Sequence, residues 1–345
     1  MGLNERSLSI LDAIVEGHIA SGEPIGSRTI ADRQKLRLSP ATVRNVMADL
    51  EERGYLVSPH TSAGRIPTDK GYRFYVDTLL QVRNLTASER QQIEVQCNSG
   101  AAQTQELLKQ AGRILSSMSN YTGIVLAPRF AATTFRHIEF VLLSQGRLLV
   151  IFVSQSGLVQ NKIIQLDGKL PTASELQQIT NYLNDELCGL TINEVRAKIV
   201  EQMQQEKAQY DAMMKDALGF SQEIFSDDIE SDVIIDGAAN ILEQPDFIDR
   251  SSMQRLFRAF EQKNNLINLL DKSQQAQGVQ IYIGSQVEFQ EFEGCSLITT
   301  NYTNGKQPLG SLGVIGPSRM KYSQVVAIVD YTAQLVSRAL KIKAE

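Results

Sequence analysis

The sequence predicts a multi-domain α+β protein whose first domain is a small helical unit that ends in a β-hairpin. A strongly marked amphipathic helix precedes two short strand-like segments near the N terminus, and strand-like runs then flank helical segments along the remaining chain. A length of 345 residues with 42% hydrophobic residues allows two or three hydrophobic cores rather than one.

The N-terminal helix over residues 40–53 is the most clearly delimited element. Ser39 can cap it, and Pro40 fills its first position, where a missing N–H costs nothing. Gly54 follows where a glycine commonly ends a helix. Apolar residues recur every three or four positions along one side: Val43, Val46, Met47 and Leu50. This spacing predicts one buried face and one exposed face.

The exposed face combines small residues with two side chains able to hydrogen-bond to base edges. Its members are Ala41, Thr42, Arg44, Asn45 and Ala48. Arginine bonds to guanine O6 and N7 and asparagine to adenine N6 and N7, whereas small residues let a helix sink into the major groove. Asp49, Glu51 and Glu52 lie in the C-terminal half, which in a helix-turn-helix points away from the bases. We interpret this face as a DNA recognition surface.

Residues 55–58 and 65–67 are short strand-like segments joined by a turn rich in Pro, Ser and Gly, a pattern that predicts a hairpin. Directly after a recognition helix, such a hairpin is the wing of a winged helix-turn-helix. Its tip can contact a phosphate backbone or the minor groove. The candidate contacts there are His60, Thr61, Ser62 and Arg65, with Lys70 on the next helix.

Two helices are expected before the recognition helix. The first covers residues 4–21 and serves as scaffold, and the second covers residues 28–36 with Ser27 as its cap. Ser27, Arg28 and Ser39 complete the set of candidate DNA contacts. From Arg28 to Arg73, nine Lys or Arg face five acidic residues, so this region is basic although the whole chain has a net charge of −5.

The rest of the chain is expected to form one interrupted α+β domain. A helix from 68 to about 83 follows the wing, and Ser88 is expected to cap a helical region that reaches residue 119. Strands are predicted at 123–127, 138–143, 148–153, 159–166, 280–283, 295–300 and 310–315, with helices at 172–187 and 322–342. The interruption contains helical segments at 194–215 and 251–270 and an acidic loop at 227–230, which we interpret as a solvated turn rather than a metal site.

Sequence segments near both ends of the chain are similar to segments of a known family. SPATVRNVMADLEERGYL and TSAGRIPTDKGYRFYVD resemble the N-terminal domain of HrcA, the bacterial repressor of heat-shock chaperone genes. IYIGSQ, CSLITTNY and LGSLGVIGPSRMKY are similar to segments of the C-terminal part of that family. The resemblance covers nearly the full chain and is weakest at about residues 188–275.

This resemblance implies a winged-helix DNA-binding domain at residues 1–85 and a GAF-like domain in two segments, 86–187 and 276–345. An inserted dimerisation domain would occupy residues 188–275. The implied function is repression of class I heat-shock operons by a homodimer on an inverted-repeat (CIRCE-type) operator in double-stranded DNA. The resemblance also implies that the GroE chaperonin modulates the repressor, and it implies no cofactor.

Other classes of protein are disfavoured by the composition. No N-terminal signal segment or run of eighteen apolar residues is present, so we expect a cytosolic protein with no membrane association. Three separated cysteines without a CxxC motif indicate reduced thiols. The three histidines sit in no nucleophile or metal motif, which argues against an enzyme. The remaining alternative is a winged-helix regulator that senses a small molecule through the GAF-like domain.

Overall fold

The structure is a computed structural model of the 345-residue chain. It describes residues 3–32, 38–60, 64–98, 104–128, 134–155, 159–165, 171–191, 194–195, 198, 233–241, 243–247, 250–261, 263–274, 276–287, 292–305 and 308–344. Among the described helices, none combines the length and apolarity needed to span a bilayer.

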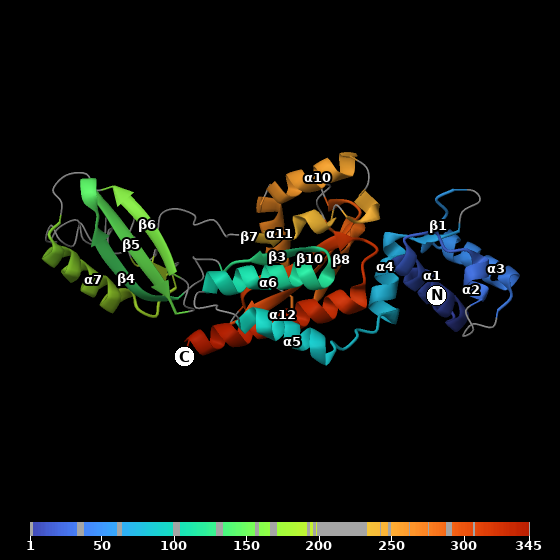
Figure 1. The fold of residues 1–345 in the computed structure, drawn as a ribbon, viewed down its shortest axis with the longest axis horizontal. Coiled ribbons are helices and arrows are strands. Elements are labelled where there is room, and N and C mark those ends of the chain that lie inside the picture. Colours follow the sequence, from blue (N-terminus) through green and yellow to red (C-terminus); the bar gives the residue numbers. More distant parts are fainter. Residues whose placement is uncertain are drawn as a thin grey trace.

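The N-terminal unit, drawn in blue at one end of the molecule in Figure 1, consists of helices with a small hairpin beside them. Its elements in chain order are α1 (Glu5–Ser21), α2 (Ser27–Ala31), α3 (Pro40–Glu52), β1 (Leu56–Val57), β2 (Ile66–Pro67), α4 (Asp69–Phe74) and a π-helical turn η1 (Tyr75–Leu79). β1 and β2 pair antiparallel. Helices, then a hairpin, then a further helix is the order predicted from the sequence.

Helix boundaries differ from the prediction in several places, and α2 ends at Ala31 instead of residue 36. Gly26, not Ser27, occupies the cap position of α2, and Ser27 is the first helical residue. The helix predicted to reach residue 83 ends at Leu79, and the backbone of Leu80 is extended. The buried Tyr75 packs toward α1 and donates a hydrogen bond to Glu16. The next helix, α5 (Ala87–Asn98), is capped by Thr86 rather than Ser88, since Glu89 forms a reciprocal capping box with Thr86.

The body of the molecule is built on one antiparallel sheet. Its strands are β3 (Thr122–Leu126), β7 (Val233–Asp236), β8 (Gln280–Ile283), β9 (Cys295–Thr303) and β10 (Pro308–Pro317). They lie in the order β7-β3-β10-β9-β8, and every pair is antiparallel. The sheet therefore joins segments from the middle and the end of the chain.

Helices cover both faces of this sheet (Figure 1). α6 (Thr104–Ser119) and α12 (Tyr322–Ala344) cover one face, with α5 (Ala87–Asn98) against them, and α10 (Arg250–Glu261) and α11 (Lys263–Gln274) cover the other. Short 3-10 turns complete the body at Ala238–Ile241, Pro245–Phe247 and Gly284–Gln286. Side chains of the strands alternate between two cores: Val125 lies in the α6/α12 core, whereas Ile124 and Leu126 lie in the α10/α11 core.

A second sheet forms a separate unit at the opposite end from the N-terminal helices in Figure 1. It contains β4 (Phe135–Leu142), β5 (Arg147–Ser154) and β6 (Val159–Gln165) in an antiparallel meander, with a 3-10 turn at Ser144–Gly146. One face packs against α7 (Ala173–Leu187), which a Thr172–Glu175 capping box begins. This unit has its own hydrophobic core.

The division between these units differs from the sequence-based boundaries at 187/188 and 275/276. The prediction places residues 135–187 in the same domain as the C-terminal strands, but they share no sheet with them. It also places β7, α10 and α11 in the insertion, yet they pack on the body sheet. The predicted boundaries are wrong because strand pairing depends on contacts between residues far apart in the sequence, which local sequence patterns do not indicate. The acidic loop at 227–230 and most of the predicted helix at 194–215 lie outside the described residues.

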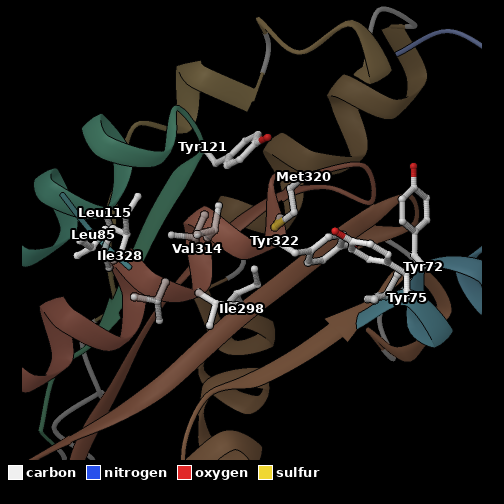
Figure 2. Close-up of a cluster of buried hydrophobic side chains, with 14 of the residues drawn as sticks. Tyr72, Tyr75, Leu85, Leu115, Tyr121, Ile298, Val314, Met320, Tyr322 and Ile328 are labelled. Carbon is white, nitrogen blue, oxygen red and sulfur yellow. The ribbon is translucent and has the colours of Figure 1, made fainter. Parts of the chain in front are cut away.

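One hydrophobic cluster continues from the N-terminal unit into the body. It contains Leu50 and Ile14 from the helical unit, Tyr72 and Tyr75 from α4 and η1, and Tyr322 from α12. Figure 2 shows Tyr72 and Tyr75 beside Tyr322, with Met320, Val314 and Ile298 deeper in the body. The N-terminal unit and the body are therefore packed together through a shared core.

Candidate nucleic-acid interface

Both ends of α3 are fixed by local interactions. Ser39 Oγ accepts a hydrogen bond from the N–H of Thr42 (3.2 Å), and Pro40 begins the helix. At the other end, Gly54 has φ +76°. The N–H groups of Gly54 and Tyr55 bond back to the carbonyls of Glu51 and Leu50, both at 2.9 Å, which is a Schellman motif. The predicted start and end of the helix are confirmed.

The two faces of α3 are also as predicted. Val43, Met47 and Leu50 are buried in the core of the N-terminal unit. The opposite side presents Ala41, Arg44, Asn45 and Ala48 as exposed residues, with Ser39 exposed and Thr42 half-buried at the edge. Within the part of the chain that the structure describes, the side chains of Arg44 and Asn45 have no hydrogen-bond or ion-pair partner. Both side chains are therefore available to a ligand.

The base of the hairpin is tied to the helices. Ile25, before α2, forms a β-bridge with Arg65, with N–H···O distances of 2.9 and 3.0 Å. The Arg65 guanidinium pairs with the Glu51 carboxylate at 2.8 Å and donates to Ser58 Oγ at 3.1 Å. A Cβ on Gly64 would lie 2.4 Å from the Ile25 backbone, so this close approach requires glycine. Arg65 thus holds the hairpin against the C-terminal half of α3.

Lys70 and Thr68 satisfy the C-terminal end of α3 and its turn. The Lys70 ammonium donates to the carbonyl of Arg53 (2.7 Å) and lies over the Tyr55 ring at 4.6 Å from its centroid. Thr68 Oγ1 donates to the carbonyl of Gly54 (2.7 Å) and also caps α4. These contacts fix α4 against the turn that links α3 to the hairpin.

The remaining predicted contacts are placed as follows. Arg28 is exposed on α2, and Ser27 beside it is half-buried. His60 is exposed at the last described position before the hairpin tip, and its carbonyl accepts a hydrogen bond from Ser58. Thr61 and Ser62 lie outside the described residues. Glu51, in the C-terminal half of α3, anchors Arg65, a role that its place in the sequence does not indicate.

A cavity of about 390 Å³ lies where the N-terminal unit meets the body. Its charged lining residues include Asp246, Arg255, Glu293 and Arg319. His18 and Tyr72 also line it, and His18 Nδ1 is 2.6 Å from the Tyr72 hydroxyl. Burial, together with the positive charge of Arg319, lowers the pKa of the His18 imidazole. The hydrogen bond between His18 Nδ1 and the Tyr72 hydroxyl therefore joins α1 to α4.

The chain matches a family model described as the HrcA protein C-terminal domain over residues 105–326. A relative from Geobacter sulfurreducens, named heat-inducible transcription repressor HrcA, is 53% identical over 339 residues, with 98% of each chain covered. Relatives with the same name from Syntrophobacter fumaroxidans and Methylobacillus flagellatus are 40% and 42% identical, with at least 98% of each chain covered. The crystal structure of a hypothetical protein shares the fold, with a TM-score of 0.68 at 23% identity over 99% of this chain and 100% of that one.

The named relatives are repressors of transcription, which is a class of protein with a non-enzymatic role. The names of these relatives confirm the expectation that the chain is not an enzyme. The chain belongs to the HrcA family of heat-inducible transcription repressors.

Proposed function

We propose that the chain represses class I heat-shock chaperone operons by binding an inverted-repeat operator as a homodimer, with the N-terminal unit as a winged helix. The observation that carries this proposal is the exposed face of α3. Arg44 and Asn45 are free of described partners there, between two alanines, on a helix whose other side is buried. Within a family of heat-inducible repressors, this face is the natural reader of operator bases.

The residues around α3 have separate roles in this proposal. Arg28 on α2 and His60 near the hairpin tip are exposed and contact phosphates, which position the unit without reading sequence. The predicted contacts at Thr61 and Ser62 would extend this set. Arg65 and Lys70 already bond to Glu51 and to the Arg53 carbonyl, so we assign them mainly to holding the hairpin beside α3.

A dimer suits a twofold operator. The surface that supports dimerisation is the face of the second sheet turned away from α7. Exposed apolar side chains gather there: Val141 is 40% exposed, Val159 57% and Ile163 56%, with half-buried Leu149 and Ile151 on the strand between them. Such an apolar face is typical of an interface between subunits. We therefore propose that this sheet, rather than residues 188–275, carries the main contact between subunits.

Dependence on the GroE chaperonin is the second part of the proposal. The body, which we regard as the GAF-like domain, pairs β3 with β10 across the whole second sheet unit. Non-local pairing of this kind is slow and leaves apolar strands exposed during folding. Heat would fill the chaperonin with other clients, reduce the supply of folded repressor and release the chaperone genes.

The rival proposal, a regulator gated by a small molecule, would use the cavity between the N-terminal unit and the body. Four of its charged groups are already paired with one another: Arg319 bonds to Asp246 at 2.9 and 3.0 Å, and Arg255 pairs with Glu293 at 3.1 Å. A charged ligand would have to break these pairs. We therefore favour regulation through folding.

The proposal is tested by measuring binding of the purified protein to the inverted repeat upstream of the chaperonin operon in the same genome. Fluorescence anisotropy with a duplex of that repeat, and with a duplex in which both half-sites are shuffled, gives the specificity ratio. A repressor of this kind binds its operator at least about a thousandfold more tightly than unrelated DNA at physiological salt. Equal affinity for both duplexes would overturn the proposal.

A further inference from the structure

The N-terminal unit is attached to the body by more than the connecting chain. Asp69 Oδ2 accepts a hydrogen bond from the N–H of Ser285 at 3.0 Å, 216 residues further along the chain. Arg73 Nη1 donates to the carbonyl of Ile281 at 2.6 Å. Both partners lie at the β8 edge of the body sheet, so α4 is joined to that edge at two points one helical turn apart.

Between these polar links lies an apolar contact. The Tyr72 and Tyr322 rings are 6.2 Å apart at 49°, and both residues are buried in the cluster shared by the two units (Figure 2). Tyr72 also bonds to His18 of α1, so the contact reaches the scaffold of the unit that holds α3. The two units therefore share a packed hydrophobic core and are not merely connected by a flexible linker.

The connecting segment after η1 is fixed as well. Ser323, at the start of α12, accepts a hydrogen bond from the N–H of Arg83 (2.9 Å) and donates to the carbonyl of Gln81 (2.5 Å). Domains joined by a small polar interface move relative to one another by default, whereas a hydrophobic interface removes that freedom. The recognition helix therefore keeps a set orientation relative to the body.

From this geometry we infer that Asp69, Tyr72 and Arg73 are positioning residues that set the operator half-site spacing the dimer accepts. The inference rests on the proposed function. Each added base pair moves a half-site by about 3.4 Å and rotates it by about 35° around the duplex. Two N-terminal units that are each fixed to the body of their own subunit within one dimer resist such a rotation, whereas two tethered units can follow it.

The test compares the wild-type chain with two variants on inverted repeats whose central spacer is the natural length or two base pairs longer. The first variant, Asp69→Ala with Arg73→Ala, removes both polar links at partly exposed positions. The second adds Tyr72→Leu, which removes the ring contact and keeps an apolar side chain. Arg113→Ala is the matched control, because Arg113 pairs with Glu106 on α6, away from α4.

The readout is the ratio of the affinities for the natural and the lengthened spacer, with binding to a single half-site as a second measurement. We expect a ratio of at least about tenfold for the wild-type chain and the control, falling toward unity through the two variants, with half-site affinity unchanged. If circular dichroism shows that the second variant does not fold, the affinity ratio of the first variant decides whether the inference holds.

Three results would overturn the inference and leave the proposed function standing. The first is a wild-type chain that binds both spacers alike, and the second is a folded variant that keeps the wild-type ratio. The third is a variant whose half-site affinity falls as much as its affinity for the natural spacer, which would assign these residues to the fold of the N-terminal unit. A chain that binds no inverted repeat would instead overturn the proposed function and this inference with it.

Discussion

At the scale of single residues, five of the described arginines of the N-terminal unit fall into two groups. Arg65, Arg53 and Arg73 each bond to a carboxylate of the protein. Arg28 and Arg44 are exposed and have no side-chain partner within the described part of the chain. A guanidinium that is already paired in the free protein must break that pair before it can bind DNA. Substitutions in the two groups should therefore have different effects on DNA binding.

Replacing Arg44 with Ala should weaken binding to the operator by about 1 to 3 kcal/mol and relax the preference at one base pair. Asn45→Ala should act in the same way at a neighbouring base pair. Arg6→Ala is the matched control, because Arg6 is an exposed arginine on α1 of the same unit. Competition binding against single-base variants of the operator measures both effects. Normal operator affinity in folded Arg44→Ala and Asn45→Ala proteins would remove α3 as the reading helix.

Arg65 was predicted from the sequence to contact DNA, and its ion pair with Glu51 changes the expected result. Arg65→Ala should lower the free energy of unfolding by about 1 kcal/mol, since the pair is only partly shielded from solvent. Arg28→Ala should instead leave stability unchanged and reduce the slope of log affinity against log salt by about one. Thermal melts and salt titrations of both variants separate the roles. A reduced slope in Arg65→Ala would restore it as a phosphate contact.

The three cysteines should differ in reactivity. Burial raises the pKa of the Cys97 thiol to about 11 and that of the Cys295 thiol to about 12, whereas Cys188 is exposed after α7. A raised pKa leaves almost no thiolate near pH 7.5. Iodoacetamide should therefore modify Cys188 alone in the native protein and all three thiols in denaturant, as read by mass spectrometry. Rapid native labelling of Cys97 would indicate that α5 opens.

At the scale of elements, what could be predicted depended on how local the determining contacts are. The cap at Ser39, the apolar stripe and Gly54 all lie within α3 or beside it, so the helix and its exposed face were predicted correctly. The strands were also found, apart from β7. Their division between two sheets was not, because it depends on pairs such as Ile124 with Ile235. The links of Asp69 and Arg73 to the β8 edge had no local signal either.

The open face of the second sheet yields a prediction for the β4–β6 element. Ile163→Glu should raise the dimer dissociation constant by at least about tenfold, because a carboxylate buried in an apolar interface loses its hydration. Val95→Glu on α5 is the matched control, since Val95 is 60% exposed but lies on the body. Sedimentation velocity over a range of concentrations measures both variants. A folded Ile163→Glu protein with the wild-type dissociation constant would place the subunit contact elsewhere.

At the scale of the whole molecule, segments that lie far apart in the sequence complete one sheet and one core. The hydroxyl of Tyr302 donates to the carbonyl of Leu126, 176 residues away, and β10 lies between β3 and β9 in the sheet. The α10/α11 core needs residues from β3, β7 and β9 together. The body therefore cannot complete this core until β7 and the C-terminal strands have joined β3.

This topology predicts that the chain regains operator binding poorly without help after dilution from denaturant. Adding GroE chaperonin with ATP should raise the recovered binding several-fold, and the difference should widen with temperature, because exposed apolar strands associate faster when warm. The matched control is native protein kept with the same chaperonin, whose operator affinity should not change. Equal recovery with and without chaperonin at every temperature would contradict regulation through folding and favour a sensor within the folded repressor itself.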